Sequence, residues 1–280
     1  MSDYFKKFKV EKGTKLSLKD RDSNDHGKHT SRHEALAEIE KNNEKMDNLQ
    51  QLLYAEGKRS LLIVLQGLDA GGKDGVIRHV IRGMNPQGCS VTGFKQPTHE
   101  ELTHDFLWRV HHHAPALGQV TIFNRSHYED VLVARVHKLV PENKWKERYQ
   151  QINNWEDLLV NQNRTLILKF FLHISKEEQL ERFKARLEDP SRQWKISESD
   201  YKEREFWGDY TSAYEEALEK TSHQHAPWFI IPSNHKWFRN LAISQIIVDS
   251  LESLKLQRPQ PSVDLNEIRE KYHKDVQKER

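Results

Sequence analysis

A glycine-rich segment that ends in a lysine is the strongest chemical signal in this sequence. Residues 67–73 read GLDAGGK and fit the pattern G-x-x-x-x-G-K. In such a loop the glycines let backbone amides turn toward phosphate oxygens, and the lysine adds a full positive charge. The loop follows an apolar run and opens a helical pattern with apolar residues at 76, 77, 80 and 81. The sequence therefore predicts a phosphate-binding loop in which Lys73 grips the phosphate that moves.

Two carboxylates in this segment depart from the usual pattern. Asp74 stands where a Ser or Thr normally binds Mg²⁺, and Asp69 lies inside the loop. An acid beside bound phosphate costs free energy unless a cation lies between them, so we interpret Asp69 as a Mg²⁺-organising or nucleotide-orienting group. Asp74 is open to the same interpretation. The structural alternatives are that Asp69 only bonds loop amides and that Asp74 only caps the following helix.

A second motif, VTIFNRSHYED at residues 120–130, places polar groups at the end of an apolar run. A P-loop enzyme normally ends this strand with an aspartate in the magnesium shell, but here the position is Asn124, a neutral oxygen donor. Arg125 follows at once and is expected to point into the crevice at the carboxyl ends of parallel strands, where its fork suits phosphate. The alternative is that Arg125 only pairs with Glu129 or Asp130.

Basic residues gather in the second half of the chain. Arg182 and Arg186 are four residues apart and share a helical face, while Arg192 and Lys195 lie in the polar segment 188–203. This basic segment carries Trp194, a candidate stacking residue, and we interpret the region of about 182–203 as a helical lid over a basic channel. An ordinary surface connection with a solvated charged face is the competing interpretation.

The elements that must hold these groups alternate along the chain. Helical patterns alternate with five short, largely apolar runs, at residues 61–66, 91–94, 119–123, 165–172 and 228–231. Two helices have capping-box starts, Thr98 with Glu101 and Ser175 with Glu178. Alternation of this kind predicts an α/β fold, a P-loop kinase-like doubly wound parallel five-stranded sheet flanked by helices.

The flanking segments differ in composition from this region. Residues 1–31 are polar and lysine-rich and are expected to form a flexible basic arm, whereas residues 259–280 read as a charged tail. A helical stripe within residues 32–56 includes Leu36, Ile39, Met46 and Leu53 and is expected to pack on its own domain rather than on another copy. We expect one domain over residues 32–258.

Bulk composition limits the class of protein. The 280 residues carry 44 Lys and Arg against 42 Asp and Glu, a formal net charge of +2, so any affinity for polyanions must come from clustering. We expect neither a nucleic acid nor a membrane as a partner. Cys89 is the only cysteine, and neither the first fifteen residues nor any later segment has the apolar length of a signal or a membrane span. The expected location is the cytoplasm.

With these segments identified, the chain resembles the family-2 polyphosphate kinases over roughly residues 32–258. The matching stretches are GLDAGGKDG at 67–75, the NPQG…PTHEELTHDFLWRVH region at 85–111, FNRSHYED at 123–130, KFFLHISKEEQ at 169–179 and ERFKARLEDPSRQWK at 181–195. The resemblance implies a P-loop fold similar to thymidylate kinase with an arginine-bearing lid. It also implies Mg²⁺-dependent phosphoryl transfer between inorganic polyphosphate and a nucleotide, and a homo-oligomer.

The motifs and the resemblance together give the candidate residue roles. The resemblance implies the roles of Asp69, Lys73, Asn124 and Arg125 and of the lid arginines, and the motifs add the others. The catalytic set is Asp69, which is also the candidate Mg²⁺ ligand, together with Lys73 and Arg125. The residues expected to bind phosphate or nucleotide are Gly67, Ala70, Gly71, Gly72, Asp74, Gly75, Asn124 and Glu129. The residues expected along polyphosphate and in the lid are Arg78, Arg182, Arg186, Arg192 and Lys195.

Two questions remain, namely which nucleotide accepts the phosphate and which compound donates it. Family members that use mainly nucleoside diphosphates tend to have Asp-Arg followed by Trp-Tyr-Asn, whereas this chain has NRSHYE at 124–129. It therefore looks like the branch that takes AMP, including members that take AMP and ADP and so make ATP. The alternative is an ATP-dependent nucleoside monophosphate kinase, against which Asp69 and Asp74 are awkward neighbours for a triphosphate donor.

Overall fold

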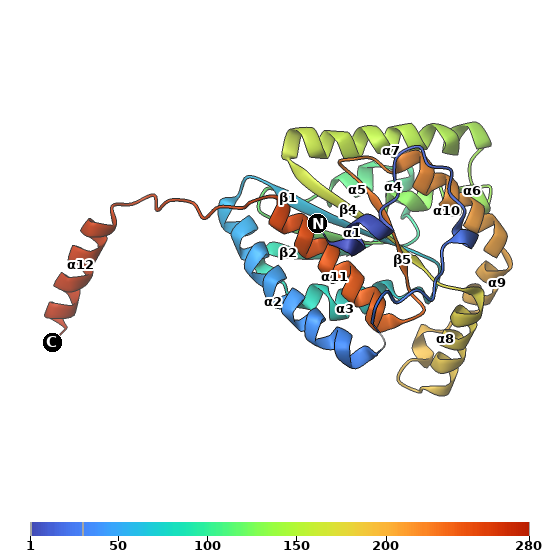
Figure 1. The fold of residues 1–280 in the computed structure, drawn as a ribbon. Helices are drawn as coiled ribbons and strands as arrows, with labels where there is room; N and C mark the ends of the chain where they lie inside the picture. Colours follow the sequence, from blue (N-terminus) through green and yellow to red (C-terminus); the bar gives the residue numbers. More distant parts are fainter. Residues whose placement is uncertain (1, 30, 280) are drawn as a thin grey trace.

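Five parallel strands form the centre of the fold in this computed structural model, which describes residues 2–29 and 31–279 (Figure 1). They are β1 Ser60–Gln66, β2 Cys89–Gly93, β3 Val120–Asn124, β4 Thr165–His173 and β5 Trp228–Pro232. Their order in the sheet is β2-β3-β1-β4-β5, with β1 in the middle, and every pairing is parallel. The predicted five-stranded parallel sheet is confirmed, and each strand end lies within two residues of the expected position.

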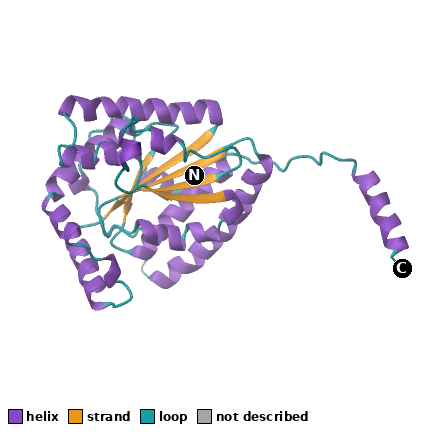
Figure 2. Cartoon of the chain, turned by 180° about the vertical axis from the view of Figure 1, so that it is seen from behind, coloured by secondary structure: helices purple, strands orange, loops and turns teal. Residues whose placement is uncertain are grey.

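Helices cover both faces of the sheet (Figure 2). The α-helices are α1 Asp3–Phe8, α2 Arg32–Glu56, α3 Lys73–His79, α4 His99–Leu102, α5 Trp108–His111, α6 Val133–Val136, α7 Glu142–Asn163, α8 Lys176–Glu188, α9 Glu198–Glu205, α10 Trp207–Thr221, α11 Lys236–Ser253 and α12 Leu265–Lys278. The 3₁₀ turns are η1 Leu18–Asp20, η2 Ile81–Gly83, η3 Pro86–Gly88, η4 His127–Asp130 and η5 Gln193–Lys195.

Alternate residues of β1 enter two separate cores. Leu62 and Val64 pack with α7 and α10 on one face, whereas Leu61 and Ile63 pack with α2, α3 and α11 on the other. Because side chains alternate across a strand, a strand covered on both faces is apolar throughout, as β1 is. This explains why the sequence patterns for β1 and β4 are continuous apolar runs.

Helix α2 packs on its own chain, as expected. It lies against α11, and Ile39, Met46 and Leu53 are buried. Leu36 departs from the expected stripe because it is 40% exposed. Asn42 takes part in the buried face instead, where its amide donates to the Ser244 hydroxyl at 3.1 Å.

The two expected capping boxes differ in outcome. Thr98 and Glu101 form both reciprocal hydrogen bonds, so the prediction for α4 is confirmed. Ser175 accepts from the Glu178 amide at 3.1 Å, but its own amide donates to Asn234 at 3.0 Å. Glu178 is turned instead toward Arg182, so only half of the second box is present.

The N-terminal segment packs on the domain, which corrects the prediction of a flexible arm. Residues 1–31 were expected to stand apart as a flexible arm, but α1 and the residues after it bury Phe8, Val10 and Leu18. Lys9 bridges Phe229 in antiparallel fashion, and the Val10 amide donates to the Trp228 carbonyl at 2.8 Å. The apolar residues escaped notice because lysines separate them, which hides the contact with β5.

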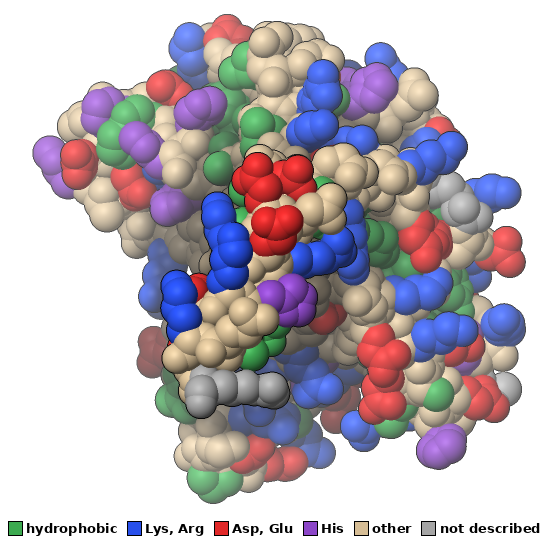
Figure 3. Space-filling model, turned by 90° about the vertical axis from the view of Figure 1, so that its left-hand side faces the viewer, with side chains coloured by type: hydrophobic (Ala, Val, Ile, Leu, Met, Phe, Trp, Pro, Cys, Tyr) green, Lys and Arg blue, Asp and Glu red, His purple; other side chains and the backbone are tan. Residues whose placement is uncertain are grey.

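The C-terminal segment stands away from the body of the molecule (Figure 1). Its expected charged tail contains helix α12, whose described residues are exposed apart from one half-buried position. Figure 3 looks at this side of the molecule and shows mostly charged and polar side chains. Residues 1, 30 and 280, which belong to the expected arm and tail, lie outside the described residues. The domain limits remain a prediction.

Within residues 2–29 and 31–279, no helix is both long enough and apolar enough to cross a membrane.

Candidate active site

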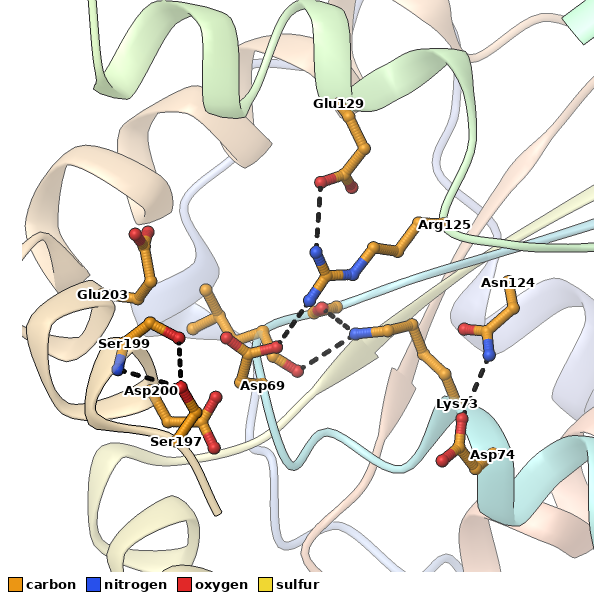
Figure 4. Close-up of polar contacts among 12 residues, drawn as sticks. Asp69, Lys73, Asp74, Asn124, Arg125, Glu129, Ser197, Ser199, Asp200 and Glu203 are labelled. Atoms are coloured by element: carbon orange, nitrogen blue, oxygen red, sulfur yellow. Dashed lines mark hydrogen bonds and ion pairs between the residues drawn. The ribbon is translucent and has the colours of Figure 1, made fainter. Parts of the chain in front are cut away.

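The loop after β1 has the backbone shape that a phosphate-binding loop needs. Gly67 has φ of 153°, and a Cβ there would lie 2.9 Å from the Leu172 carbonyl oxygen, so only glycine fits beside β4. Ala70 has φ of 60°, in the left-handed region that non-glycine residues rarely adopt. Lys73 Nζ donates to the Gly67 carbonyl at 2.5 Å and to the Leu68 carbonyl at 3.3 Å (Figure 4). Lys73 is thus folded back over its own loop.

Arg125 reaches the same loop from the end of β3. Its Nη2 donates to Asp69 Oδ1 at 2.8 Å, and its Nη1 lies 3.8 Å from Glu129 Oε2 (Figure 4). The predicted alternative partner Glu129 is therefore present, but the shorter contact is with Asp69. Arg125 has φ of 62°, a strained conformation held in place by its backbone N–H, which donates a hydrogen bond to the Leu65 carbonyl at 3.1 Å. Such strain is typical of functional positions.

Charges in this cluster act on one another. Burial raises the pKa of Glu129, against the opposing effect of Arg125. Burial, followed by the nearby Arg125 guanidinium, lowers the pKa of Lys73, while Asp69 and Glu129 oppose the change. For Arg125 itself, burial disfavours the charge, but Glu129 and Asp69 outweigh it and raise the pKa. The site therefore holds two cations and two acids within electrostatic reach of one another.

Asp74 links three elements rather than capping a helix. The residue before α3 is Gly72, and no side chain caps this helix. Asp74 Oδ1 accepts from Asn124 Nδ2 at 3.0 Å, and Oδ2 pairs with Lys195 Nζ at 3.0 Å (Figure 4 shows the first). Although partial burial opposes it, these two hydrogen bonds lower the pKa of Asp74. Asn124 therefore presents its amide nitrogen to Asp74.

Arg182 holds the phosphate loop through hydrogen bonds to its backbone carbonyls. It is buried, and its Nη1 donates to the Ala70 carbonyl at 2.8 Å and the Gly71 carbonyl at 3.0 Å. Its Nε donates to Glu178 at 2.7 Å, and its Nη2 also bonds the Ser233 carbonyl. The sequence predicts Arg182 as a lid residue, but these contacts fix it to the phosphate loop, where it lines the cleft.

A large cleft of about 1480 Å³ runs over the loop. Twelve Lys and Arg residues line it against four Asp and Glu, although the whole chain has a net charge of only +2. Most residues singled out from the sequence line it, namely Asp69, Ala70, Gly72, Lys73, Asp74, Gly75, Arg78, Asn124, Arg125, Arg182, Arg186, Arg192 and Lys195. Gly67, Gly71 and Glu129 do not line the cleft but contact residues that do. The basic residues thus gather in one channel.

The lid cations are paired with acids. Arg186 Nη1 lies 3.4 Å from Asp200 Oδ2, and Arg192 Nε lies 2.8 Å from Asp189 Oδ2. Burial and the nearby Asp69 raise the pKa of Asp200, which shows that the helix α9 lies within electrostatic reach of the loop. Trp194 is 77% exposed and lines the cleft. Lys195 of η5 pairs with Asp74 in the first turn of α3. Figure 4 shows Asp200 of α9 on the Asp69 side of the site.

Five of the twelve cleft cations were not singled out from the sequence, namely Arg32, Arg82, Lys95, Lys236 and Arg239. Lys236 and Arg239 lie on α11, which follows β5. The one signal that could have found them is their place after an apolar strand, because ligands bind beyond the carboxyl ends of parallel strands. Among residues 2–29 and 31–279, no group of three or more His, Cys, Asp or Glu side chains is arranged to hold a metal ion.

The comparison with known families decides among phosphate-binding folds. The sequence profile described as "Polyphosphate kinase 2 (PPK2)" matches residues 29–259. The chain belongs to the polyphosphate kinase 2 family. As a member of this family it is a phosphotransferase, a kinase whose transfer reactions involve nucleotides and polyphosphate.

Related polyphosphate kinase 2 proteins match nearly the whole chain. An AMP/ADP-polyphosphate phosphotransferase of Meiothermus ruber is 47% identical over 267 residues, covering 94% of this chain and 98% of the relative. An ADP-polyphosphate phosphotransferase of Rhodopseudomonas palustris is 46% identical over 229 residues, covering 78% of this chain and 79% of the relative. The crystal structure of polyphosphate kinase 2 from Arthrobacter aurescens superimposes with a TM-score of 0.93 at 40% identity, covering 98% and 97% of the two chains. The predicted fold and family are thus confirmed.

Proposed function

We propose that this chain transfers the terminal phosphate of inorganic polyphosphate to AMP, giving ADP, and to ADP, giving ATP, with Mg²⁺ and in a reversible manner. The observation that carries the proposal is the cleft, in which twelve cations face four acids over a phosphate-binding loop. A long chain of phosphates is the substrate that needs so many fixed positive charges along one path. The relative named for both AMP and ADP supports the choice of acceptors.

Positioning and charge neutralisation are enough for this chemistry. A phosphate oxygen of AMP or ADP is already an anionic nucleophile, so no strong general base is required. Lys73 is held on two loop carbonyls 2.5 and 3.3 Å away and would exchange them for oxygens of the phosphate in transfer. Arg125, oriented by Asp69 and Glu129, would hold the attacking phosphate in line.

The order of the strands separates the two sides of the loop. The loop follows β1, with Arg125 after β3 on one side and Arg182 and Arg239 after β4 and β5 on the other. An in-line displacement needs donor and acceptor on opposite sides of the moving phosphate. Arg125 on the β3 side, with Asp69 and Glu129 as its partners, suits the phosphate of the nucleotide. Arg182, Lys236 and Arg239, which follow β4 and β5, suit the polyphosphate donor.

Magnesium fits the site as a shared ligand of protein and substrate. Kinase magnesium ions are usually bound by one or two carboxylates together with substrate phosphates rather than by an all-protein cage. Asp69 provides such a carboxylate in the cleft, because it accepts from Arg125 through one oxygen only and a carboxylate has about four acceptor positions. When bound, the ion would neutralise charge on the phosphate oxygens. We assign Asp69 as its protein ligand.

An ATP-dependent monophosphate kinase is the alternative. A donor nucleoside would need a largely apolar slot beyond the loop. The residues there include Arg182, Lys236 and Arg239, which favour a phosphate chain over an adenosine.

The test is nucleotide analysis after mixing the purified protein with Mg²⁺, polyphosphate and AMP, with ADP in a parallel reaction. We expect ADP and then ATP from AMP, and ATP from ADP. Reactions with ATP in place of polyphosphate distinguish the alternative. Transfer that occurs only with ATP as donor would overturn the proposal.

We further propose that the enzyme acts as a homo-oligomer in the cytoplasm. The single cysteine suits a reducing compartment, and the resemblance to the family-2 polyphosphate kinases implies an oligomer. Sedimentation velocity of the purified protein measures the state, and a monomer at micromolar concentration would contradict the oligomer.

A further inference from the structure

Arg239 is a buried guanidinium without a carboxylate partner. It is 2% exposed, and its Nε and Nη2 both donate to the side-chain oxygen of Asn240, at 3.1 and 2.9 Å. Its Nη1 donates to the Gly71 carbonyl at 3.4 Å. Across residues 2–29 and 31–279, no acid lies within ion-pair distance of it. Neutral oxygens thus hold its hydrogen bonds, but its charge has no counter-charge in the chain.

The guanidinium lies against the phosphate loop. A Cβ at Gly72 would lie 1.8 Å from Arg239 Nη1, and a Cβ at Gly75 would lie 2.8 Å from Nη2. Gly72 of the loop and Gly75 of α3 therefore leave the space that the guanidinium fills. Arg239 also lines the basic cleft together with Lys236 of the same helix. Its charge is consequently at the edge of the space where phosphate would bind.

This arrangement is costly while no anion is bound. Taking a charge out of water without a partner disfavours the folded state, and a second cation nearby adds repulsion. Burial, and then the neighbouring Arg182, lowers the pKa of Arg239 to about 9. Arg182 has Glu178 as a counter-ion, and Arg239 has none. A cation kept at such a cost beside a phosphate loop points to an anionic ligand that supplies the missing charge.

We propose that Arg239 is a phosphate-binding residue for the donor chain, and that polyphosphate supplies the counter-charge that the protein lacks. This inference rests on the proposed function. It assigns Arg239 to the donor rather than the nucleotide because α11 follows β5, on the side of the loop away from Arg125. The guanidinium fork suits phosphate oxygens, and a site already dry and positive loses little reorganisation energy on binding.

The test compares Arg239→Met with Arg109→Met. Arg109 is also buried, but it pairs with Glu101 at 3.1 Å and does not line the cleft. For each protein we would measure the thermal midpoint without ligand and the affinities for inorganic tripolyphosphate and, separately, for AMP. Arg239→Met should weaken tripolyphosphate binding by about tenfold or more, with AMP affinity changed by less than about twofold.

The two variants should also shift the thermal midpoint of the ligand-free protein in different directions. Arg239→Met removes an unpaired buried charge, so its thermal midpoint should not fall below that of the parent protein. Arg109→Met removes the ion pair with Glu101 and the hydrogen bond to the Lys95 carbonyl, so its midpoint should fall while tripolyphosphate affinity is kept. An Arg239→Met protein that binds tripolyphosphate like the parent, or that loses AMP affinity to the same degree, overturns the proposal.

A conservative variant guards against failure to fold. Arg239→Lys keeps the charge but loses the fork, and it should weaken tripolyphosphate binding about threefold or more without changing AMP affinity. An unchanged tripolyphosphate affinity in this variant also overturns the proposal. Because the probe is a binding ligand, failure of the parent protein to turn over polyphosphate would refute the proposed function while leaving the assignment of Arg239 to be decided by affinity.

Discussion

Two buried cations of this chain differ in whether an acid neutralises their charge. Lys169, in the middle of β4, is fully buried and donates to Glu156 Oε2 at 2.6 Å, to the Tyr128 hydroxyl at 3.0 Å and to the Thr221 carbonyl at 2.7 Å. Arg239, beside the phosphate loop, is almost as deeply buried but has only neutral oxygens. The first charge is neutralised inside the protein, and the second is not.

The presence or absence of a counter-charge distinguishes a structural cation from a cation that binds a ligand. A buried ion pair adds little net stability but becomes destabilising when one member is removed. An unpaired buried charge lowers stability from the start, and it persists only where a ligand makes up for it. On this view the core cations should matter for unfolding, and the cleft cations should matter for phosphate transfer. Four changes test the distinction.

The largest effect should come from Lys73→Ala. Lys73 bonds only carbonyls of its own loop, so the fold should survive, while phosphate transfer from polyphosphate should fall by about 10³-fold or more. Initial rates of ADP formation and the thermal midpoint measure the two effects. Lys184→Ala, at an exposed position of α8 outside the cleft, is the matched control and should keep both. Substantial activity in Lys73→Ala would remove Lys73 from the transfer step.

Lys169→Met should act on stability. Removing one member of a buried pair leaves Glu156 charged and unpaired, which costs roughly 3–5 kcal/mol. Denaturant unfolding measures the change, and adding Glu156→Leu should restore most of it. Lys45→Met, which breaks an exposed pair with Glu252, should cost less than about 1 kcal/mol. Equal losses in the two single variants would contradict the distinction between buried and exposed pairs.

Asp130 extends the test to a half-buried acid and to the pH dependence of stability. Burial raises the pKa of Asp130 to about 6, although Arg148 opposes the change. Because the folded state holds this proton more tightly than the unfolded state, the associated stability is present at low pH and is lost as pH rises from about 4 to about 6. Asp130→Asn should therefore gain on the order of 2 kcal/mol at pH 7 and almost nothing at pH 4. Urea unfolding at both pH values measures the free energy of unfolding. A gain in stability that is the same at pH 4 and pH 7 would contradict the prediction.

The smallest effect should come from Lys195→Ala in the lid. Its pair with Asp74 is exposed, so stability should change by less than about 1 kcal/mol. The KM for polyphosphate should rise about fivefold to tenfold, because a cation of the cleft is lost. Lys202→Ala, at an exposed position of α9 outside the cleft, is the control and should leave KM unchanged. A loss of stability without a change in KM would mean that Lys195 acts on folding, like the core cations, and not on polyphosphate binding.

The elements of the fold could be predicted because their signals are local. The five strands are short apolar runs, and the phosphate loop between β1 and α3 has a fixed spacing of Gly67, Gly72 and Lys73. The contact of Arg125 with Asp69 joins two strands that are neighbours only in the sheet. Sequence reasoning weighed Glu129 and Asp130 as partners because they are near in the chain, and so it missed the shorter contact.

The remaining parts of the site depend on packing between distant segments. Arg239 is one arginine in an apolar helix, and only the closeness of α11 to Gly72 and Gly75 makes its charge significant. Arg182 was expected in the lid because its neighbours in sequence are basic, whereas its position is set by the carbonyls of Ala70 and Gly71. Neither relationship has a period or a motif that a sequence pattern can reveal.

The contact of Lys9 and Val10 with β5 has a consequence for handling the protein. β5 is the last strand of the sheet, and its apolar residues Trp228–Pro232 would otherwise present unpaired backbone groups along one side. Open strand edges of this kind recruit other chains into intermolecular pairing. Removing the first ten residues, or pulling them away with a rigid fusion partner, should therefore promote aggregation before it affects the chemistry at the opposite end of the strands.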